Sequence, residues 1–353
     1  MRILIGEISS YKAIVIARYI HQKYPNVELS AYDNKPLVKV IHTRYITHIV
    51  HIPFSSQETY VEELSKYVQT NNIDVLLPVH SDSIGVILRH KKWFGHALDW
   101  IGEYDDYMRL HEKDKLMNIA SMLDIRVPQS YKSIGDARVP FVVKPINLSS
   151  AKGVRYYTCE SDKLSIGAIP RNTICQEYIS GQGCGYEVYC QDGKILTEYG
   201  HIRLAEWPIS GGSSVLRERY IHPQMRAIAE KILSVVPWSG FAMFEFKLTS
   251  SNELILIEVN PRIWGSINQA LQDGCPMFEH VIKNCDGFTI SGDRAEYRTE
   301  LWPQVWLAMI GYAFRGEGKK VLDWIKHLRS TRRDVSFWTD PLGLISIIIR
   351  KLQ

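Results

Sequence analysis

Apolar residues follow two alternating patterns along the first hundred residues. Short apolar runs, typical of buried strands, are separated by longer segments in which apolar positions recur every three or four residues, as on one face of a helix. The strand-like runs are residues 2–5, 27–32 and 75–79, and the helix-like segments are residues 14–24 and 58–70. This order, with short connections, predicts an α/β domain with a parallel, doubly wound sheet covered by helices.

The turn after the first strand narrows the choice of fold. Gly6 is its only glycine before Ser9 and Ser10, so the glycine-rich fingerprint of dinucleotide-binding domains is missing. A cofactor-binding Rossmann domain is therefore disfavoured.

The pattern changes in the next part of the chain. A helix is expected at 112–123, ended by Asp124 and by the extended pair Val127-Pro128. Beyond it most segments read as strands, joined in places by hairpin turns such as Asp192-Gly193. The expected strands are 141–144, 154–158, 173–178, 187–191, 194–199, 242–248 and 254–259, with one helix at 224–234. This part of the chain is therefore expected to be α+β.

The last predicted hairpin carries the strongest chemical signal. Glu245 lies near the middle of one strand, and Glu258 and Asn260 end the next. Residues two apart on a strand point to the same face, and the hairpin turn at 249–252 can place Glu245 beside them. Two carboxylates and an amide oxygen are ligands suited to magnesium, and burying such carboxylates without a cation would be costly. Unrelated acids on an exposed strand edge are the alternative.

Two weaker signals precede this hairpin. Lys144 ends an apolar strand just before a loop of small residues at 147–154, where an ammonium group and loop amides can hold a phosphate. A surface lysine followed by an ordinary hairpin has the same appearance. The tetrapeptide Gln176-Glu177-Tyr178-Ile179 ends the next apolar strand before the loop 180–185.

The order and spacing of these motifs resemble the ATP-grasp superfamily, which includes carboxylate–amine ligases, biotin carboxylase and the carbamoyl-phosphate synthase large subunit. The resemblance extends over about residues 1–285, and the loop after Lys144 departs from the family in having a single glycine. The motifs that carry it are Lys115, Lys144-Pro145, Ser150-Ala151-Lys152-Gly153-Val154, Gln176-Glu177-Tyr178-Ile179, Glu245 and Glu258-Val259-Asn260-Pro261-Arg262.

The resemblance implies that ATP is bound between two α+β lobes, with magnesium as one or two ions and manganese as a substitute. Lys115 and Lys144 would contact the phosphates, and Arg262 would stabilise the phosphoryl group during transfer. The metal would be held by Glu245, Glu258 and Asn260. The residues implied for the rest of the nucleotide are Ser150, Lys152 and Gly153 in the phosphate loop, the main chain of Gln176 and Tyr178 beside Glu177 and Ile179 at the adenine, and Glu187 at the ribose.

A closer resemblance lies in residues 200–214. The run Gly200-His201-Ile202-Arg203-Leu204-Ala205-Glu206-Trp207-Pro208, followed by Gly211-Gly212-Ser213-Ser214, is similar to a stretch in the ATP-grasp branch that includes D-aspartate ligase. In that setting Arg203 would clamp a carboxylate or an acyl phosphate, because a guanidinium binds such groups with two hydrogen bonds. An ion pair of Arg203 with Glu198 or Glu206 is the alternative.

Composition disfavours several classes of partner. The chain has 353 residues and a net charge of +4, with no long basic run and no RNA-binding aromatic motif, so no nucleic-acid partner is expected. Its six cysteines show no CxxC and no metal spacing, which favours reduced thiols in a cytoplasmic protein. No stretch approaches the ~20 apolar residues that span a bilayer.

We divide the chain into four parts from these patterns. They are residues 1–108 as an N-terminal α/β domain, 109–183 as a small lobe with its leading helix, 184–285 as a large lobe with the metal site, and 286–353 as a helical, Trp-rich basic tail. The tail combines cations and aromatic residues with a short apolar terminus. It can lie on an anionic membrane surface at the inner face, or pack on its own protein or on a second subunit.

These features predict an ATP-dependent ligase, monomeric or homodimeric. Its substrates would be a small-molecule carboxylate, activated as an acyl phosphate, and an amine, often of an amino acid, that attacks it to form an amide. Ser81, Ser213 and Ser266 are candidates for contacts with the acceptor. The alternatives are a reaction through carboxyphosphate or carbamoyl phosphate, and a nucleotide-binding adaptor without catalysis.

Overall fold

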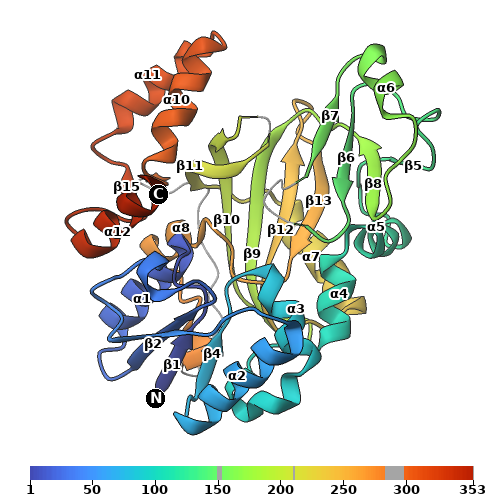
Figure 1. Cartoon of the computed structure of the whole chain (residues 1–353). Coiled ribbons are helices and arrows are strands. Elements are labelled where there is room, and N and C mark those ends of the chain that lie inside the picture. The colour runs from blue at the N-terminus through green and yellow to red at the C-terminus, as the bar shows by residue number, and fades with distance from the viewer. Residues whose placement is uncertain (149–152, 210, 283–297, 353) are drawn as a thin grey trace.

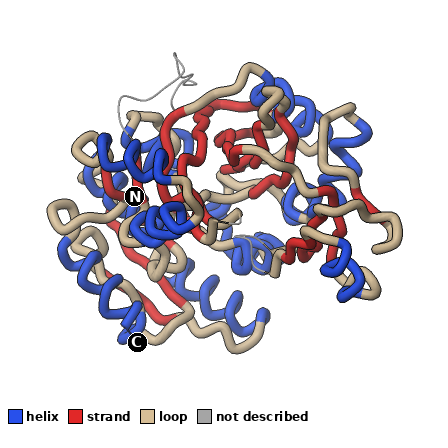
Figure 2. Tube along the Cα trace, turned by 90° about the horizontal axis from the view of Figure 1, so that it is seen from above, coloured by secondary structure: helices blue, strands red, loops and turns tan. Residues whose placement is uncertain are grey.

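The strands of the chain form three sheets, which Figure 1 shows in a computed structural model. The structure describes residues 1–148, 153–209, 211–282 and 298–352. A parallel sheet lies in the N-terminal domain, and a small and a large sheet follow along the chain. Figure 2 shows the same arrangement from above. The mixture of parallel α/β and antiparallel α+β parts confirms the predicted fold class.

The N-terminal domain contains the predicted parallel sheet. β1 (Arg2–Ile5) lies between β2 (Glu28–Asp33) and β4 (Val75–Leu77), and β3 (His48–His51) forms an edge, with every pairing parallel. The sequence pattern does not predict β3, because only two apolar residues lie between its histidines. The helices are α1 (Tyr11–Lys23), α2 (Gln57–Thr70) and α3 (Ser81–Arg89), with the 3-10 helices η1 (Leu37–Lys39) and η2 (Lys91–Leu98).

The small lobe is an antiparallel sheet in the order β5-β8-β6-β7. Its strands are β5 (Ser130–Tyr131), β6 (Phe141–Pro145), β7 (Arg155–Tyr157) and β8 (Thr173–Glu177), with the helix α6 (Glu160–Ile166). Phe141 stacks on Tyr157 with ring centroids 4.8 Å apart, which gives this lobe a core of its own. Two helices, α4 (Tyr104–His111) and α5 (Lys113–Met122), precede the lobe and contact β13 (Leu254–Asn260) of the large sheet.

The large sheet has the strand order β13-β12-β9-β10-β11-β14-β15. Its strands are β9 (Gln182–Gln191), β10 (Lys194–Trp207), β11 (Ser213–Arg219), β12 (Gly240–Leu248), β13 (Leu254–Asn260), β14 (Thr299–Glu300) and β15 (Arg332–Arg333), and its helices are α7 (Gln224–Val235), α8 (Ile267–Gln272) and α9 (Glu279–Ile282). β9 and β10 extend beyond the predicted strands, because glycines interrupt the apolar pattern there. At Gly200 the close packing leaves no room for a side chain, since a Cβ would lie 2.3 Å from the carbonyl oxygen of Tyr220.

The C-terminal segment packs on two parts of its own protein. It contains α10 (Gln304–Phe314), α11 (Gly318–His327) and α12 (Pro341–Leu352), and it adds β14 and β15 to the large sheet. Val305 and Met309 of α10 share a core with Val215 of β11. On α12, Ile347 contacts the N-terminal domain through Ile14. Among the helices of the described residues, none is long and apolar enough to cross a membrane.

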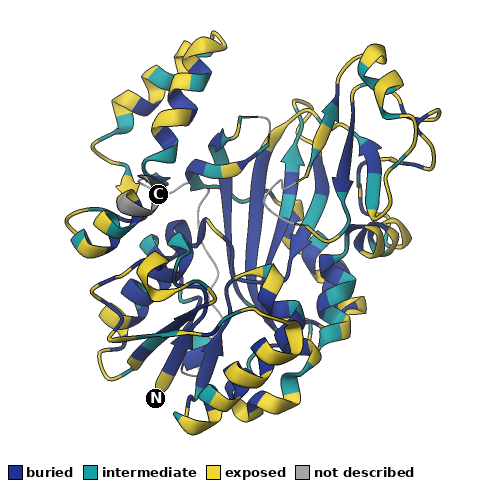
Figure 3. Cartoon of the chain, in the orientation of Figure 1, coloured by how far each residue is buried: buried dark blue, intermediate teal, exposed yellow. Residues whose placement is uncertain are grey.

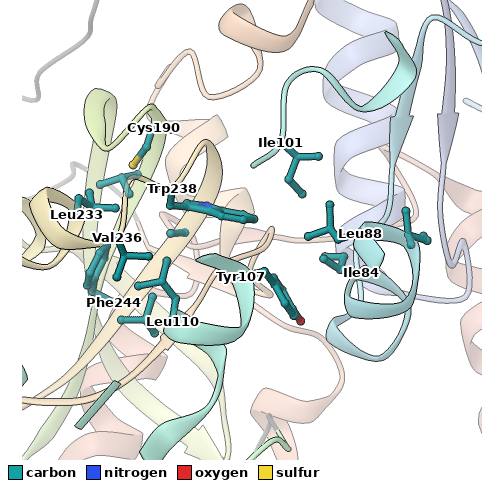
Figure 4. Packing of buried hydrophobic residues seen from close by; sticks show 14 of the residues in the cluster. Ile84, Leu88, Ile101, Tyr107, Leu110, Cys190, Leu233, Val236, Trp238 and Phe244 are labelled. Carbon is teal, nitrogen blue, oxygen red and sulfur yellow. The ribbon is translucent and has the colours of Figure 1, made fainter. Parts of the chain in front are cut away.

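A continuous core joins the N-terminal domain to the large sheet. Buried residues run through the sheets and the helices between them, and exposed residues lie on the outer helix faces (Figure 3). Trp238 is at the junction, where its ring lies in one cluster with Ile101 and Tyr107 (Figure 4). It is fully buried, and its Nε1 donates to the carbonyl oxygen of Phe241 at 3.1 Å. This packing holds the N-terminal domain against the lobe that carries the predicted site.

We predict that Trp238→Ala lowers the free energy of unfolding by about 3–5 kcal/mol, because it removes a buried ring and leaves a cavity. Denaturant unfolding followed by circular dichroism measures this change. Trp338→Ala is the matched control, since Trp338 is 89% exposed and its loss is expected to change stability by less than about 0.5 kcal/mol. Equal losses of unfolding free energy in the two variants would show that Trp238 does not stabilise the contact between the N-terminal domain and the large sheet.

Candidate active site

A cavity of about 1370 Å³ lies between the N-terminal domain, the small lobe and the large sheet. The N-terminal domain contributes the loop after β1 and the start of α3, the small lobe contributes β6 and the end of β8, and the large sheet contributes β10, β12 and β13. This volume is above the usual range for one drug-sized ligand. The cavity is therefore large enough to hold more than one small reactant.

Of the three predicted metal ligands, Glu245 and Glu258 lie on the wall of this cavity, and the buried Asn260 contacts both of them. β12 and β13 pair so that Glu245 lies opposite Glu258, as the predicted hairpin requires, and a β-bulge follows directly. Asn260 donates from Nδ2 to Glu245 Oε1 at 3.0 Å and to Glu258 Oε1 at 2.9 Å. The described parts of the chain contain no group of three or more His, Cys, Asp or Glu arranged for a metal. A metal at this point would thus bind two carboxylates and an amide oxygen.

Cations around the acidic pair determine its protonation. Lys113 Nζ lies 3.3 Å from Glu258 Oε2. Burial opposes ionisation of Glu258, but the charge of Lys113, the hydrogen bond from Asn260 and the charge of Lys144 outweigh it and lower the pKa of Glu258 to about 2. For Glu245, burial and the charge of Glu258 raise the pKa, against the opposing charge of Arg203. The pair therefore needs neighbouring positive charge to stay fully ionised.

Lys144 lies near the end of β6 with its side chain in the cavity wall. Burial lowers the pKa of its ammonium group to about 8. The negative charge of Glu258 opposes this shift, and the positive charge of Lys113 adds to it. A lysine of this kind gains strongly from an anion placed beside it, because the anion restores the charged form.

The first predicted phosphate lysine, Lys115, is not in the cavity wall. Its side chain is 50% exposed and pairs with Glu112 at 2.6 Å. Lys113, two residues earlier, lines the cavity and donates to the carbonyl oxygen of Leu148 at 2.5 Å. Residues two apart on a helix point in nearly opposite directions. The sequence shows both lysines at the start of α5 but gives no sign of which one faces the cavity.

Arg203 forms the ion pair with Glu206 that the sequence offered as the alternative to a substrate clamp. It lines the cavity, and it forms ion pairs with Glu245 and, at 3.3 Å, with Glu206. Burial opposes its charge, but the two carboxylates raise the pKa of Arg203. Glu198, the other suggested partner, pairs with Arg226 at 2.7 Å instead.

Arg262 connects the acidic pair to the N-terminal domain. Its Nη2 donates to Asn260 Oδ1 at 3.0 Å, and its Nε donates to Ser81 Oγ at 2.7 Å, at the first residue of α3. Nearby, Lys12 of α1 donates from Nζ to the carbonyl oxygens of Ile263, at 3.0 Å, and Val79. Sequence reasoning did not identify Lys12, which looks like an ordinary polar position in an amphipathic helix. The lining also contains Ser81, Ser213 and Ser266, the candidates for acceptor contacts.

Three of the four residues predicted at the adenine line the cavity, and the fourth does not. Glu177, Tyr178 and Ile179 line the cavity, and Tyr178 lies edge-on to Tyr156 of β7 with ring centroids 5.9 Å apart. Gln176 does not line it, because its fully buried side chain points into the small lobe and donates to Ser130 Oγ at 3.3 Å. The aromatic wall formed by Tyr156 and Tyr178 is suited to a flat ring.

Of the residues implied for the phosphate loop, the structure describes Gly153. Ser150 and Lys152 lie outside the described residues. Gly153 has a φ of +74°, and a Cβ there would lie 2.9 Å from Pro145 Cγ, so a glycine is required at the end of this loop.

The ribose role expected of Glu187 does not agree with the structure. Its side chain is fully buried, pairs with His201 Nδ1 and is not part of the cavity lining. Glu187 lies on the same face of the sheet as Glu245 but opposite Met243, where its side chain is fully covered, whereas Gly185 is opposite Glu245. Gly185 makes room for the pair, since a Cβ there would lie 2.7 Å from His201 Cε1.

The comparisons with known proteins agree with this geometry. Residues 111–266 match the ATP-grasp domain family. A comparison with curated proteins gives no match.

Three solved structures share the fold at low sequence identity. The L-amino acid ligase from Bacillus licheniformis is 14% identical, with a TM-score of 0.57 over 76% of this chain and 69% of that one. The N5-carboxyaminoimidazole ribonucleotide synthetase from Thermotoga maritima is 15% identical, with a TM-score of 0.60 over 82% and 78%. The biotin carboxylase domain of the Hydrogenobacter thermophilus 2-oxoglutarate carboxylase, in complex with MgADP and bicarbonate, is 11% identical, with a TM-score of 0.62 over 84% and 73%. The ATP-grasp domain match thus covers residues 111–266, and the fold shared with these solved structures extends over most of the chain.

Proposed function

We propose that this protein is an ATP- and magnesium-dependent carboxylate–amine ligase that forms an amide through an acyl phosphate. The observation that carries the proposal is the meeting of an acidic pair with cations from separate elements on the wall of one large cavity. Phosphoryl transfer needs this combination, because catalysis depends on positioning the phosphates and neutralising their charge. The fold shared with an L-amino acid ligase supports the choice of reaction.

Magnesium would be held by oxygens of Glu245, Glu258 and Asn260. The carboxylates fit a cation because they are cross-strand neighbours that are costly to keep ionised together. Asn260, whose amide nitrogen faces them while its oxygen accepts from Arg262, would turn its oxygen toward the metal. When bound, the metal would neutralise charge on the phosphate oxygens of ATP. The resemblance to ATP-grasp enzymes implies one or two magnesium ions, with manganese as a substitute.

For the nucleotide, we assign the phosphates to Lys113 and Lys144. Lys113 replaces Lys115 in this role, because its ammonium group is beside the acidic pair and that of Lys115 is in solvent. The adenine would lie along residues 177–179, next to Tyr156 and Tyr178. Glu187 has no part in this assignment.

The remaining part of the cavity would hold the two other substrates. A carboxylate oxygen attacks the γ-phosphorus of ATP, ADP leaves, and an acyl phosphate is formed. The amine nitrogen then attacks the acyl carbon, loses a proton, and phosphate leaves as the amide forms. Arg262 would stabilise the transferring phosphoryl group, and Arg203 would hold the carboxylate or acyl phosphate. Closure of the small lobe would exclude water, which otherwise hydrolyses an acyl phosphate.

The proposed reaction predicts that ADP release requires a carboxylate and an amine together. We would measure ADP with pools of amino acids and small carboxylates, with and without bicarbonate. Dependence on bicarbonate alone would instead identify a carboxyphosphate reaction, and no turnover with any pool would favour a nucleotide-binding adaptor. Glu258→Gln should lower kcat by at least about 100-fold with an unchanged circular dichroism spectrum, because it removes one charge from the metal site.

Lys113 and Lys115 provide a matched pair for the phosphate assignment. Lys113→Ala should weaken binding of ATP by about 10- to 100-fold, because it removes a charge-assisted contact. Lys115→Ala should change the affinity by no more than about twofold, as expected for an exposed lysine. Titration calorimetry with ATP and magnesium measures both. The assignment is wrong if Lys115→Ala has the larger effect.

The pKa of Lys144 can be followed directly by NMR of ¹³C-labelled lysine. In the protein without ligands its resonance should titrate with a midpoint near 8, and Lys144→Arg identifies it. Glu258→Gln should move the midpoint lower, because the Glu258 charge favours the ammonium form. ADP with magnesium should move it higher if a phosphate lies beside Lys144. A midpoint near 10.5 without ligands would contradict the buried position of this side chain.

A further inference from the structure

The helices α10 and α11 carry several exposed apolar residues. Figure 1 shows where the two helices lie, and Figure 3 shows that much of each is exposed. On α10 the exposed residues recur with helical spacing, and they are Trp306, Leu307, Ile310 and Phe314, the last of which is 88% exposed. The opposite side of α10 packs on the large sheet through Val305 and Met309. The exposed stripe is therefore not needed for the core.

α11 continues this surface and adds positive charge to it. Leu322 is 60% exposed and Ile325 is half exposed. Lys319, Lys326 and Arg329 are exposed at positions three or four residues from them, so cations and apolar side chains share one face of the helix. Trp306 of α10 meets Trp324 of α11 edge-on with ring centroids 4.7 Å apart, which holds the two helices together.

The charge of the chain is concentrated in this region. Residues 304–333 contain seven Lys and Arg against two Asp and Glu, a net charge of +5, whereas the whole chain carries +4. Both acids are paired, Glu317 with Lys320 at 2.9 Å and Asp323 with Arg298 at 2.6 Å. The exposed apolar side chains are thus bordered mainly by cations.

We propose that the α10–α11 surface, defined by Trp306, Leu307, Ile310, Phe314, Leu322, Ile325 and the cations Lys319, Lys326 and Arg329, docks on an anionic lipid membrane. Apolar side chains bordered by lysine and arginine are typical of helices that lie in the plane of a membrane surface. The cations would contact acidic headgroups, and the aromatic and aliphatic side chains would enter the interface.

A second copy of the chain is a less suitable partner for this surface. A twofold dimer through the α10–α11 surface would bring the same patch of each protomer together. The concentrated positive charges would then face each other, which disfavours association. An anionic membrane instead attracts the cations through its headgroups and removes the apolar side chains from water.

Docking would place the cavity close to the membrane. Tyr312 and Arg315 of this hairpin, with Lys320, are part of the cavity lining, and the Tyr312 hydroxyl accepts from the amide of Glu206 at 3.3 Å. The hairpin therefore has one side on the cavity and another on the proposed membrane surface. The inference concerns where the protein acts and does not depend on which reaction it catalyses.

Vesicle co-sedimentation of the full-length protein tests this inference. We expect binding to vesicles of phosphatidylcholine and phosphatidylglycerol in equal amounts, weakening as salt is raised because the headgroup attraction is screened. Lys326→Gln with Arg329→Gln should reduce the binding constant by about tenfold or more. Ile310→Ser with Phe314→Ser should reduce it similarly, because it removes apolar side chains from the interface.

The matched control is Lys66→Gln with Lys132→Gln, which removes two exposed lysines from α2 and the small lobe. It should bind vesicles as the unsubstituted protein does. The variants change only exposed residues, so unfolding curves should coincide and show that folding is intact. Three results would overturn the inference: no binding to anionic vesicles at low salt, equal binding to vesicles of phosphatidylcholine alone, or a dimer in light scattering that Ile310→Ser with Phe314→Ser dissociates.

Discussion

Two half-buried carboxylates that lie side by side impose the main electrostatic constraint on this molecule. Glu245 and Glu258 are direct cross-strand neighbours, and desolvation and their mutual repulsion oppose the ionisation of both. Positive charges from different parts of the chain, rather than from one local motif, stabilise the ionised forms of both carboxylates. These are Lys113 from α5, Lys144 from β6, Arg203 from β10 and Arg262 after β13. The acidic pair thus links the small lobe to the large sheet.

The same network extends into the N-terminal domain. Arg262 donates a hydrogen bond to Ser81 at the start of α3, and Lys12 donates one to the carbonyl oxygen of Ile263. Both contacts lie beyond the carboxyl ends of the parallel strands, which is where α/β sheets usually bind ligands. The N-terminal domain is therefore a structural part of the cavity wall, and the buried junction around Trp238 keeps it in position.

The C-terminal segment is only partly covered by the rest of the protein. α12 packs on the N-terminal domain through Ile347, which answers part of the question that the sequence left open about this tail. α10 packs on the large sheet with one side only and leaves its other side exposed. The two parts of the tail therefore differ in how completely the protein itself covers their apolar residues.

Local patterns in the sequence were sufficient for the acidic hairpin and for most of the longer strands, but they did not predict β5, β11, β14 or β15. Parallel strands follow from alternating strand and helix periods, and Glu245, Glu258 and Asn260 meet because strand residues alternate between faces. The apolar pattern also missed β3, where histidines flank two apolar residues, and the first half of β9, where glycines interrupt it. Motif order, rather than any single residue, was sufficient to predict the ATP-grasp domain that residues 111–266 match.

What the sequence by itself determined is the set of residue types at this site and their order along the chain. Only the tertiary structure decided which of them reach the cavity: Lys113 faces it and Lys115 does not, Glu187 is turned to His201, and Arg203 is shared between Glu206 and Glu245. The physical reason is that periodicity gives the direction of a side chain relative to its own helix or strand. It does not give the position of that element against another lobe, and the cavity is formed between lobes.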